Sequence, residues 1–224
     1  MTQKSGFLQS TIGRKQLVAL TGLGISLFVL GHMAGNLLMF VSPQAYNEYG
    51  HAIISNKLIY AIELGLAAAF LGHAFVALRL QFLNRGARPQ RYAMTPNGEK
   101  KPAAASQTMA IQGTILLVFI ILHLRTFKYG PYYEVDYGQG PIRDLFRLMA
   151  EVFQGPGYVA WYVVAMIVLG LHLSHGIRSL LQTVGVHHPQ HQGKIKCLAY
   201  GYALLVSIGF ISQPIFMLFF YKGS

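Results

Sequence analysis

Residues 14–36 read RKQLVALTGLGISLFVLGHMAGN, two basic residues followed by a long apolar run. The run has no further charged residue and a single histidine, His32. A side chain that can ionise is costly inside a lipid bilayer, so its presence there indicates a function. Imidazole is also the side chain that most often binds a metal. The segment therefore predicts a membrane-spanning helix that carries a functional histidine.

The composition of the whole chain is that of a membrane protein. Of 224 residues, 53% are hydrophobic and 11% are charged, whereas a soluble domain has roughly 25% charged residues. Uncharged stretches recur along the chain, and each is close to or above the ~20 residues needed to cross a bilayer, the second only if Glu63 is included. We predict an all-α membrane protein with one membrane domain over residues 1–224. Five transmembrane helices are expected, near residues 16–41, 57–83, 106–128, 157–181 and 196–220.

Lys and Arg residues predict the orientation of the chain. Most of them precede the first helix, or lie in or beside the loops that join the second helix to the third and the fourth to the fifth. Positively charged loops stay on the cytoplasmic side of a membrane. We therefore expect a cytoplasmic N-terminus and a C-terminus outside. This topology explains the net charge of +11, so we expect no nucleic-acid partner.

The loop between the third and fourth helices contains IRDLFRLMAEVF, residues 142–153. Its apolar residues recur with a helical period, which predicts an amphipathic helix on the outer surface.

Cysteine usage limits the possible cofactors. Cys197 is the single cysteine, which excludes an intrachain disulfide, an iron–sulfur cluster and a covalently attached c-type haem.

Three further apolar segments contain a histidine at membrane depth: His73, His123 and His172. A rise of about 1.5 Å per residue places His32 and His123 roughly 25 Å along outward-running helices, near the outer side. The second and fourth helices run inward, so His73 and His172 lie near the inner side. His175, one turn from His172, is the alternative on the fourth helix. We favour His172 because it and His73 both precede an arginine by six residues.

Two histidines at one level of a four-helix bundle suit the two axial positions of a six-coordinate haem iron, a site for electron transfer. We expect the first four helices to hold two haems b. His32 and His123 would bind the outer iron, and His73 and His172 the inner one. Small residues near three of the ligands would leave room for the porphyrin: Gly35, Ala69, Ala77 and Gly176. Nearby basic residues would either bind haem propionates or anchor helix ends: Arg79, Arg125, Lys128 and Arg178.

Glu63 is the one acidic residue inside a predicted transmembrane segment. It follows Lys57 by six residues, which places it roughly 9 Å below the outer face, near the outer haem. Reduction of a quinone consumes two protons and needs a titratable group beside an apolar slot. Glu63 is therefore a candidate for quinone or proton chemistry. Two alternatives stay open: a simple ion pair with Lys57, and a quinone site on the inner side near His175, Arg178 and Ser179.

Four segments of the chain resemble one membrane-protein family. They are RKQLVALTGLGISLFVLGHMAGN (14–36), FLGHAFVALRL (70–80), FIILHLRTFKYG (119–130) and LGLHLSHGIRSLLQTVGV (169–186). Together they resemble the single-polypeptide, five-helix, di-haem cytochrome b subunit of succinate:quinone oxidoreductases, which comprise succinate dehydrogenases and fumarate reductases. The resemblance covers nearly the whole chain, and the four histidines fall where this family has its axial haem ligands.

The resemblance implies partners and an activity. A flavoprotein subunit carrying FAD would interconvert succinate and fumarate, and an iron–sulfur subunit would connect it to this membrane anchor. Electrons would pass through the two haems to or from ubiquinone or menaquinone in the cytoplasmic membrane of a bacterium. The chain would thus be part of an enzyme whose succinate chemistry resides in a partner. The alternatives are a b-type cytochrome subunit of another membrane oxidoreductase, such as a hydrogenase or formate dehydrogenase, and a haem-free transporter whose histidines relay protons.

Overall fold

The computed structural model describes residues 10–86, 108–186 and 188–221, and most of these are helical. Five helices are long and apolar enough to span a membrane, which confirms the prediction of a multi-pass membrane protein. Two of them end in a different helical turn: α1 (Thr11–Asn36) in the 3₁₀ turn η2 (Leu37–Phe40), and α5 (Met109–His123) in the π-helical turn η4 (Leu124–Lys128). The other three are α3 (Ile59–Gly86), α7 (Pro156–Thr183) and α8 (Gln192–Phe219), the last preceded by the 3₁₀ turn η5 (Pro189–His191).

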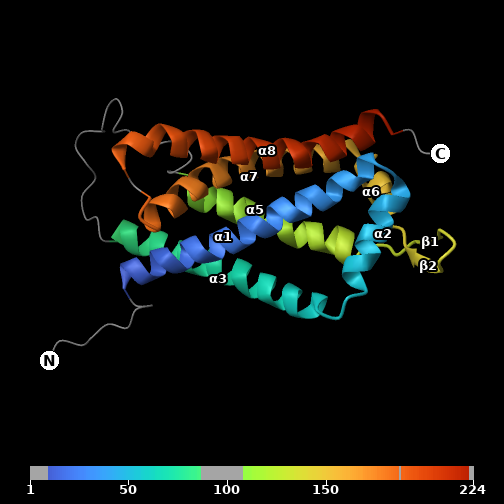
Figure 1. Ribbon diagram of the computed structural model, residues 1–224, viewed down its shortest axis with the longest axis horizontal. Helices are drawn as coiled ribbons and strands as arrows, with labels where there is room; N and C mark the ends of the chain where they lie inside the picture. Colours follow the sequence, from blue (N-terminus) through green and yellow to red (C-terminus); the bar gives the residue numbers. More distant parts are fainter. Residues whose placement is uncertain (1–9, 87–107, 187, 222–224) are drawn as a thin grey trace.

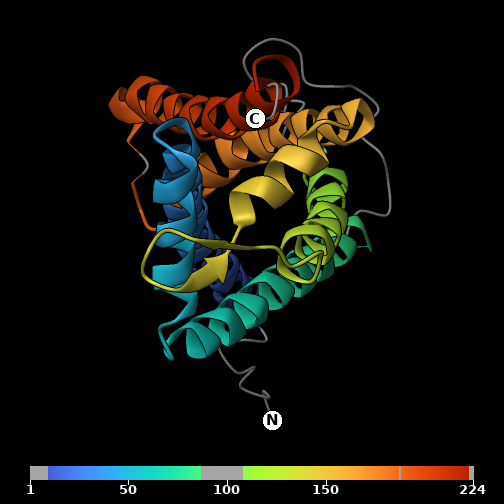
Figure 2. The same ribbon diagram turned by 90° about the vertical axis from the view of Figure 1, so that its right-hand side faces the viewer.

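Four of the long helices form a ring (Figures 1 and 2). α1 and α5 each contact both α3 and α7. α1 therefore stands diagonally across the ring from α5, and α3 stands diagonally across from α7. α8 lies outside this ring, against α7 and α1. α1 begins and α8 ends at opposite ends of the bundle, as an odd number of spans requires (Figure 1).

α8 is attached to the ring by close packing and short polar links. The Ser207 hydroxyl in α8 donates to the carbonyl of Met166 in α7 (3.1 Å). The Tyr202 hydroxyl donates to the carbonyl of Ser26 in α1 (2.8 Å) and lies 2.7 Å from the Ser26 hydroxyl. Lipid is as apolar as the helices themselves, so helices in a membrane associate through such contacts rather than through the hydrophobic effect.

One end of the bundle is covered by an end cap made of α2 (Pro43–Ile54), the strands β1 (Glu134–Asp136) and β2 (Pro141–Arg143), and α6 (Leu145–Phe153) (Figure 2). α2 lies outside the helices predicted from the sequence. Its start has a clear signal, because the Ser42 hydroxyl accepts the N–H of Ala45 (3.0 Å) and Pro43 occupies the first turn.

The two strands form a hairpin in which Val135 pairs with Ile142. The Asp136 carboxylate accepts the N–H groups of Gly138 (2.7 Å) and Gly140 (3.1 Å) and so closes the turn. Both glycines have positive φ angles, 89° and 101°, in a region that other residues rarely adopt. The hairpin therefore depends on the sequence DYGQG at 136–140.

α6 is shorter than the amphipathic helix predicted over residues 142–153. It begins at Leu145 because the preceding residues pair as β2, and because the Asp144 carboxylate caps the helix by accepting the N–H of Arg147 (2.9 Å). Its apolar face is turned into the protein and not onto lipid. The buried side chains on this face are Phe146, Leu148, Met149 and Phe153. α6 thus closes the end of the bundle.

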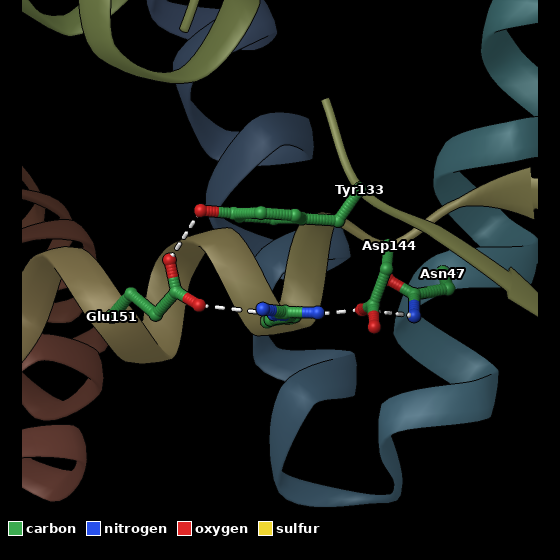
Figure 3. A network of polar contacts seen from close by, with 5 residues as sticks. Asn47, Tyr133, Asp144 and Glu151 are labelled. Atoms are coloured by element: carbon green, nitrogen blue, oxygen red, sulfur yellow. Dashed lines mark hydrogen bonds and ion pairs between the residues drawn. The ribbon is translucent and has the colours of Figure 1, made fainter. Parts of the chain in front are cut away.

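Asn47 fastens α2 to α6, and its side chain is fully buried. The side-chain carbonyl accepts the N–H of Phe146 (2.9 Å), and the amide donates to Asp144 (2.8 Å) and to the Tyr137 hydroxyl (3.0 Å). Figure 3 shows Asn47 and Asp144 side by side. One amide therefore satisfies the first turn of α6 and holds its capping carboxylate.

The network continues at the surface of the end cap (Figure 3). The Tyr133 hydroxyl and Arg147 Nε both donate to the Glu151 carboxylate, at 2.6 and 2.9 Å. The hydrogen bond from Tyr133, and then that from Arg147, hold the pKa of Glu151 below its usual value. A lowered carboxyl pKa stabilises the fold above the pKa of the unfolded chain, and this contribution is lost as the pH falls. It is small because the groups are exposed.

Replacing Asn47 tests the end cap. Asn47→Ala is expected to lower the free energy of unfolding by about 1–3 kcal/mol, because buried polar groups of α6 lose their partner. Gln44→Ala on the same helix is the matched control, since Gln44 is exposed and bonds only the Glu48 side chain. Thermal unfolding in detergent measures both variants. Equal stability of the two variants would contradict the role of Asn47.

Candidate functional site

The four histidines of the ring lie in two pairs. The ring centroids of His32 on α1 and His123 on α5 are 5.9 Å apart, with an angle of 82° between the rings. Those of His73 on α3 and His172 on α7 are 6.4 Å apart, at 67°. These are the pairs that helical rise and chain direction predict, and each spans a diagonal of the ring. Among the described residues, the histidine facing His73 is His172, while His175 makes no ring contact.

The two pairs occupy different levels of the bundle. The His73 ring lies against Gly22 of α1, where an added Cβ would be 3.1 Å from its Cε1. Gly22 precedes His32 by ten residues, which corresponds to about 15 Å along the helix. On the other side of the ring, Gly113 of α5 lies beside His172, at 3.8 Å from a Cβ built there to Cε1. The sequence analysis missed both glycines, because nothing in a sequence links a glycine on one helix to a histidine on another.

The spacing within each pair fits a metal held between two imidazoles. With metal–nitrogen bonds of about 2 Å, and ring centres about 1.1 Å behind the nitrogens, two rings on opposite sides of one metal have centroids about 6.2 Å apart. The observed separations of 5.9 and 6.4 Å lie on either side of this value. Within the described ranges, Nε2 of His123 and Nε2 of His172 make no hydrogen bond, and the buried Nδ1 of His172 has no partner. Both ring nitrogens of His32 lie near the side-chain nitrogen of Asn36, at 3.3 and 3.4 Å.

The protein offers two ligands at each level and no more. In the part of the chain that the structure describes, no group of three or more His, Cys, Asp or Glu side chains converges. A metal in either pair would therefore need its other ligands from a cofactor. A porphyrin supplies four nitrogens in a plane and leaves two axial positions, which is the complement of what each pair offers.

Aromatic side chains surround the pair His32 and His123. Phe28 stacks on His32, with centroids 5.5 Å apart at 11°, and Phe119 stacks on His123, at 5.7 Å and 23°. Phe127, one turn after His123, contacts the same ring at 5.3 Å. Such side chains provide an apolar environment for a planar cofactor and keep water from it.

Gly35, predicted to leave room for a porphyrin, has another role. A Cβ at Gly35 would lie 2.6 Å from Cζ of Tyr49, so this glycine lets α2 approach α1. The prediction for Gly35 is therefore wrong. A Cβ built at Gly176 would meet no atom within 4 Å among the described residues, and its predicted role stays a prediction.

A second contact between α1 and α2 lies next to Gly35. The Asn36 side-chain carbonyl accepts a hydrogen bond from the Tyr46 hydroxyl at 2.9 Å, and burial raises the pKa of Tyr46 to about 12.

The predicted propionate partners differ in their surroundings. Arg178 is half-buried, and its Nε is buried without a hydrogen-bond partner among the described residues. It is thus the one best placed to receive an anion. The side chains of Arg79 and Arg125 are exposed, as expected for residues that anchor helix ends.

Glu63 forms an ion pair with Lys128 and not with Lys57, which was the expected alternative. The pair links α3 to η4, and Lys128 follows His123 by five residues, so Glu63 lies at the end of the bundle that holds His32 and His123. Both side chains remain partly open to their surroundings, with 40% of Glu63 and 36% of Lys128 exposed. The π turn that carries Lys128 follows His123 directly, and such turns are frequent at functional sites.

Two imidazole pairs at two levels of an apolar ring can hold two planar metal cofactors in series. An ion pair then lies near one end of the series. Arg178, whose Nε has no hydrogen-bond partner among the described residues, lies on the helix that carries His172. This arrangement suits transfer of electrons across a membrane better than binding of a soluble ligand. A comparison with known proteins finds no matching family model, no matching curated protein and no matching solved structure.

Proposed function

We propose that this chain is the di-haem cytochrome b subunit of a succinate:quinone oxidoreductase. The observation that carries the haem assignment is the spacing of the two diagonal histidine pairs, each of which fits two axial ligands of one iron. The succinate or fumarate partner is supported by the resemblance of the four histidine-bearing segments to that family. The chain would reside in the cytoplasmic membrane of a bacterium, with a flavoprotein and an iron–sulfur subunit bound on its inner side.

Each residue of the site has a defined task in this proposal. His32 and His123 hold the outer haem b, and His73 and His172 hold the inner one. A haem iron with two imidazole ligands accepts and releases single electrons and leaves no position open for oxygen. The protein fixes the level of each ligand pair and shields it with apolar side chains. Arg178 is positioned to neutralise a propionate of the inner haem.

Glu63 is assigned to proton exchange with a quinone. A quinone that gains two electrons also takes up two protons, and a carboxyl group can supply or remove one of them. The ion pair with Lys128 holds this carboxylate at the end of the bundle near His123. The partly exposed position of the pair, beside the outer histidines, allows a quinone to approach from the membrane.

The histidine pairs are tested by counting haems. His32→Ala and His123→Ala are each expected to remove one of two haems, because an iron with one remaining axial ligand is held weakly. The spectrum of the other haem should persist. His175→Ala is the matched control on α7 and should keep both haems. Reduced-minus-oxidised spectra and haem content per polypeptide measure this. Loss of the same haem in His32→Ala and His73→Ala would refute the diagonal pairing.

The Glu63 assignment is tested with the assembled complex. Glu63→Gln removes the titratable group and keeps the shape, so quinone turnover is expected to fall about 100-fold with normal haem content. Glu48→Gln is the control, because Glu48 is an exposed acid at the same end of the molecule. Steady-state assays with ubiquinone and menaquinone analogues, in both directions, give the rates. Unchanged turnover in Glu63→Gln would remove this residue from the mechanism.

The identity of the partner is tested by the electron donor. In membranes of cells that express the whole complex, succinate is expected to reduce the b-type haems, and reoxidation by fumarate should follow. Hydrogen and formate should leave them oxidised. Reduction by hydrogen or formate but not by succinate would favour a different membrane oxidoreductase with the same haem subunit architecture. If the protein is produced with an ample supply of haem and folds without showing b-type bands, the proton-relay transporter would be favoured.

A further inference from the structure

In each histidine pair, one ring nitrogen meets a hydroxyl group from a different helix. Nδ1 of His73 on α3 lies 3.1 Å from Oγ1 of Thr21 on α1. Nδ1 of His123 on α5 lies 3.2 Å from Oη of Tyr162 on α7. A neutral imidazole has one protonated and one bare nitrogen, and the hydrogen bond of one nitrogen determines which of them is free to bind a metal.

The direction of the hydrogen bond at Thr21 follows from counting protons. Oγ1 of Thr21 lies 2.7 Å from the carbonyl oxygen of Leu17 and 3.2 Å from that of Val18. A carbonyl can only accept, and a hydroxyl has a single proton to donate. The Thr21 proton is therefore directed to its own helix, and its lone pairs face His73. Nδ1 of His73 is then the donor to Thr21, which leaves the lone pair on Nε2. The backbone of Val18 on the same helix is a second hydrogen-bond partner of the His73 ring.

We propose that Thr21 is a positioning residue for the inner metal site: its hydroxyl accepts the Nδ1–H of His73 and so presents Nε2 as the metal-binding nitrogen. Gly22, the next residue, lets the ring lie close to α1, since a Cβ there would be 3.1 Å from the ring. Thr21 thus orients the His73 ring by a hydrogen bond, and Gly22 leaves the space in which the ring lies. The part of this inference that concerns haem depends on the proposed function, whereas the tautomer of His73 does not.

The two rings of the inner pair are held differently. Nδ1 of His73 is hydrogen-bonded to Thr21 on α1, whereas the buried Nδ1 of His172 has no hydrogen-bond partner among the described residues. In the outer pair the Tyr162 hydroxyl has no second acceptor in the described ranges, so its proton can point either way until a metal binds His123. At His32, the side-chain nitrogen of Asn36, which can only donate, lies 3.3 Å from Nδ1 and 3.4 Å from Nε2. Among the four histidines, His73 is the one whose Nδ1 faces a hydroxyl that donates to its own helix. Thr21 sets the geometry of the inner site before the cofactor arrives.

A hydrogen bond from Nδ1–H makes an imidazole more basic and a better electron donor to iron. This favours the oxidised metal. Removing the Thr21 hydroxyl should therefore raise the reduction potential of the inner haem, by about tenfold in the equilibrium constant, or about 59 mV for one electron. The outer haem should be unaffected, because Thr21 lies about 16 Å from the level of His32 along α1.

The test uses the full-length chain in lipid nanodiscs, with Thr21→Val, Thr21→Ser and a control. Valine keeps the shape of threonine without the hydroxyl, and serine restores the hydroxyl. Thr114→Val is the matched control, because Thr114 also donates to a carbonyl one turn earlier (2.9 Å) but contacts no histidine. Redox titration gives the two potentials, and the inner haem is the one that survives in His32→Ala. We expect a raised inner potential, or loss of that haem alone, only in Thr21→Val.

A second measurement needs no haem. In the haem-free protein with ¹⁵N-labelled histidine, solid-state NMR distinguishes protonated Nδ1 from protonated Nε2. His73, identified by its loss in His73→Gln, is expected as the Nδ1–H form in the wild type and in Thr21→Ser, and as a mixture in Thr21→Val. Nε2–H at His73 in the wild type would overturn the proposal. So would unchanged potentials in Thr21→Val, or equal loss of both haems there. Absence of haem from the wild type would refute the proposed function and leave the NMR result to decide on Thr21.

Discussion

The arrangement of the helices depends on four imidazoles that have to be kept away from lipid. A polar ring in the hydrocarbon layer is costly unless it faces a partner inside the bundle. One histidine on each of four helices meets this requirement when the helices form a ring and the histidines point inward. The chain then places partners across the diagonals, α1 with α5 and α3 with α7. α8 carries no such histidine and accordingly lies outside the ring.

The two ends of the ring are built differently. At the end near His32 and His123, the end cap closes the bundle with the buried face of α6, and a buried amide at Asn47 fixes that helix. The same end has aromatic stacking on both histidines and the Glu63 ion pair. The other pair relies on two glycines for space and on Thr21 for orientation. In the proposed function, this difference separates a site at which a quinone would exchange protons from a site that would only relay electrons.

Much of this could be predicted from the sequence, for identifiable reasons. Charge-free runs show the five spans because lipid imposes the same requirement on every spanning helix. The constant rise of a helix converts residue number into depth, and depth alone pairs His32 with His123 and His73 with His172. Gly35 was misassigned because its neighbour in sequence, His32, is not what lies against it. Tyr49, on a helix that was not predicted, is what it contacts.

What the sequence could not supply are contacts between segments far apart in the chain. Thr21 and His73 are separated by 52 residues, and Asn47 and Phe146 by 99. A threonine in an apolar helix usually bonds only its own backbone, and Thr114 does so. Nothing in the residues around Thr21 distinguishes it from Thr114. Only the fold shows that one of the two faces an imidazole.

α3 shows why the site and the fold cannot be separated in this molecule. None of the side chains described in its span is buried, whereas one third of the most apolar window is buried in α7 and in α8. Its contacts with α1 and α5 are made by half-buried side chains. Two polar contacts add to them: His73 to Thr21 on α1, and Glu63 to Lys128 on η4. In lipid such contacts contribute on the order of 1 kcal/mol each. A cofactor held between His73 and His172 would bind only the assembled ring and stabilise it by mass action, so it would also hold α3 in place.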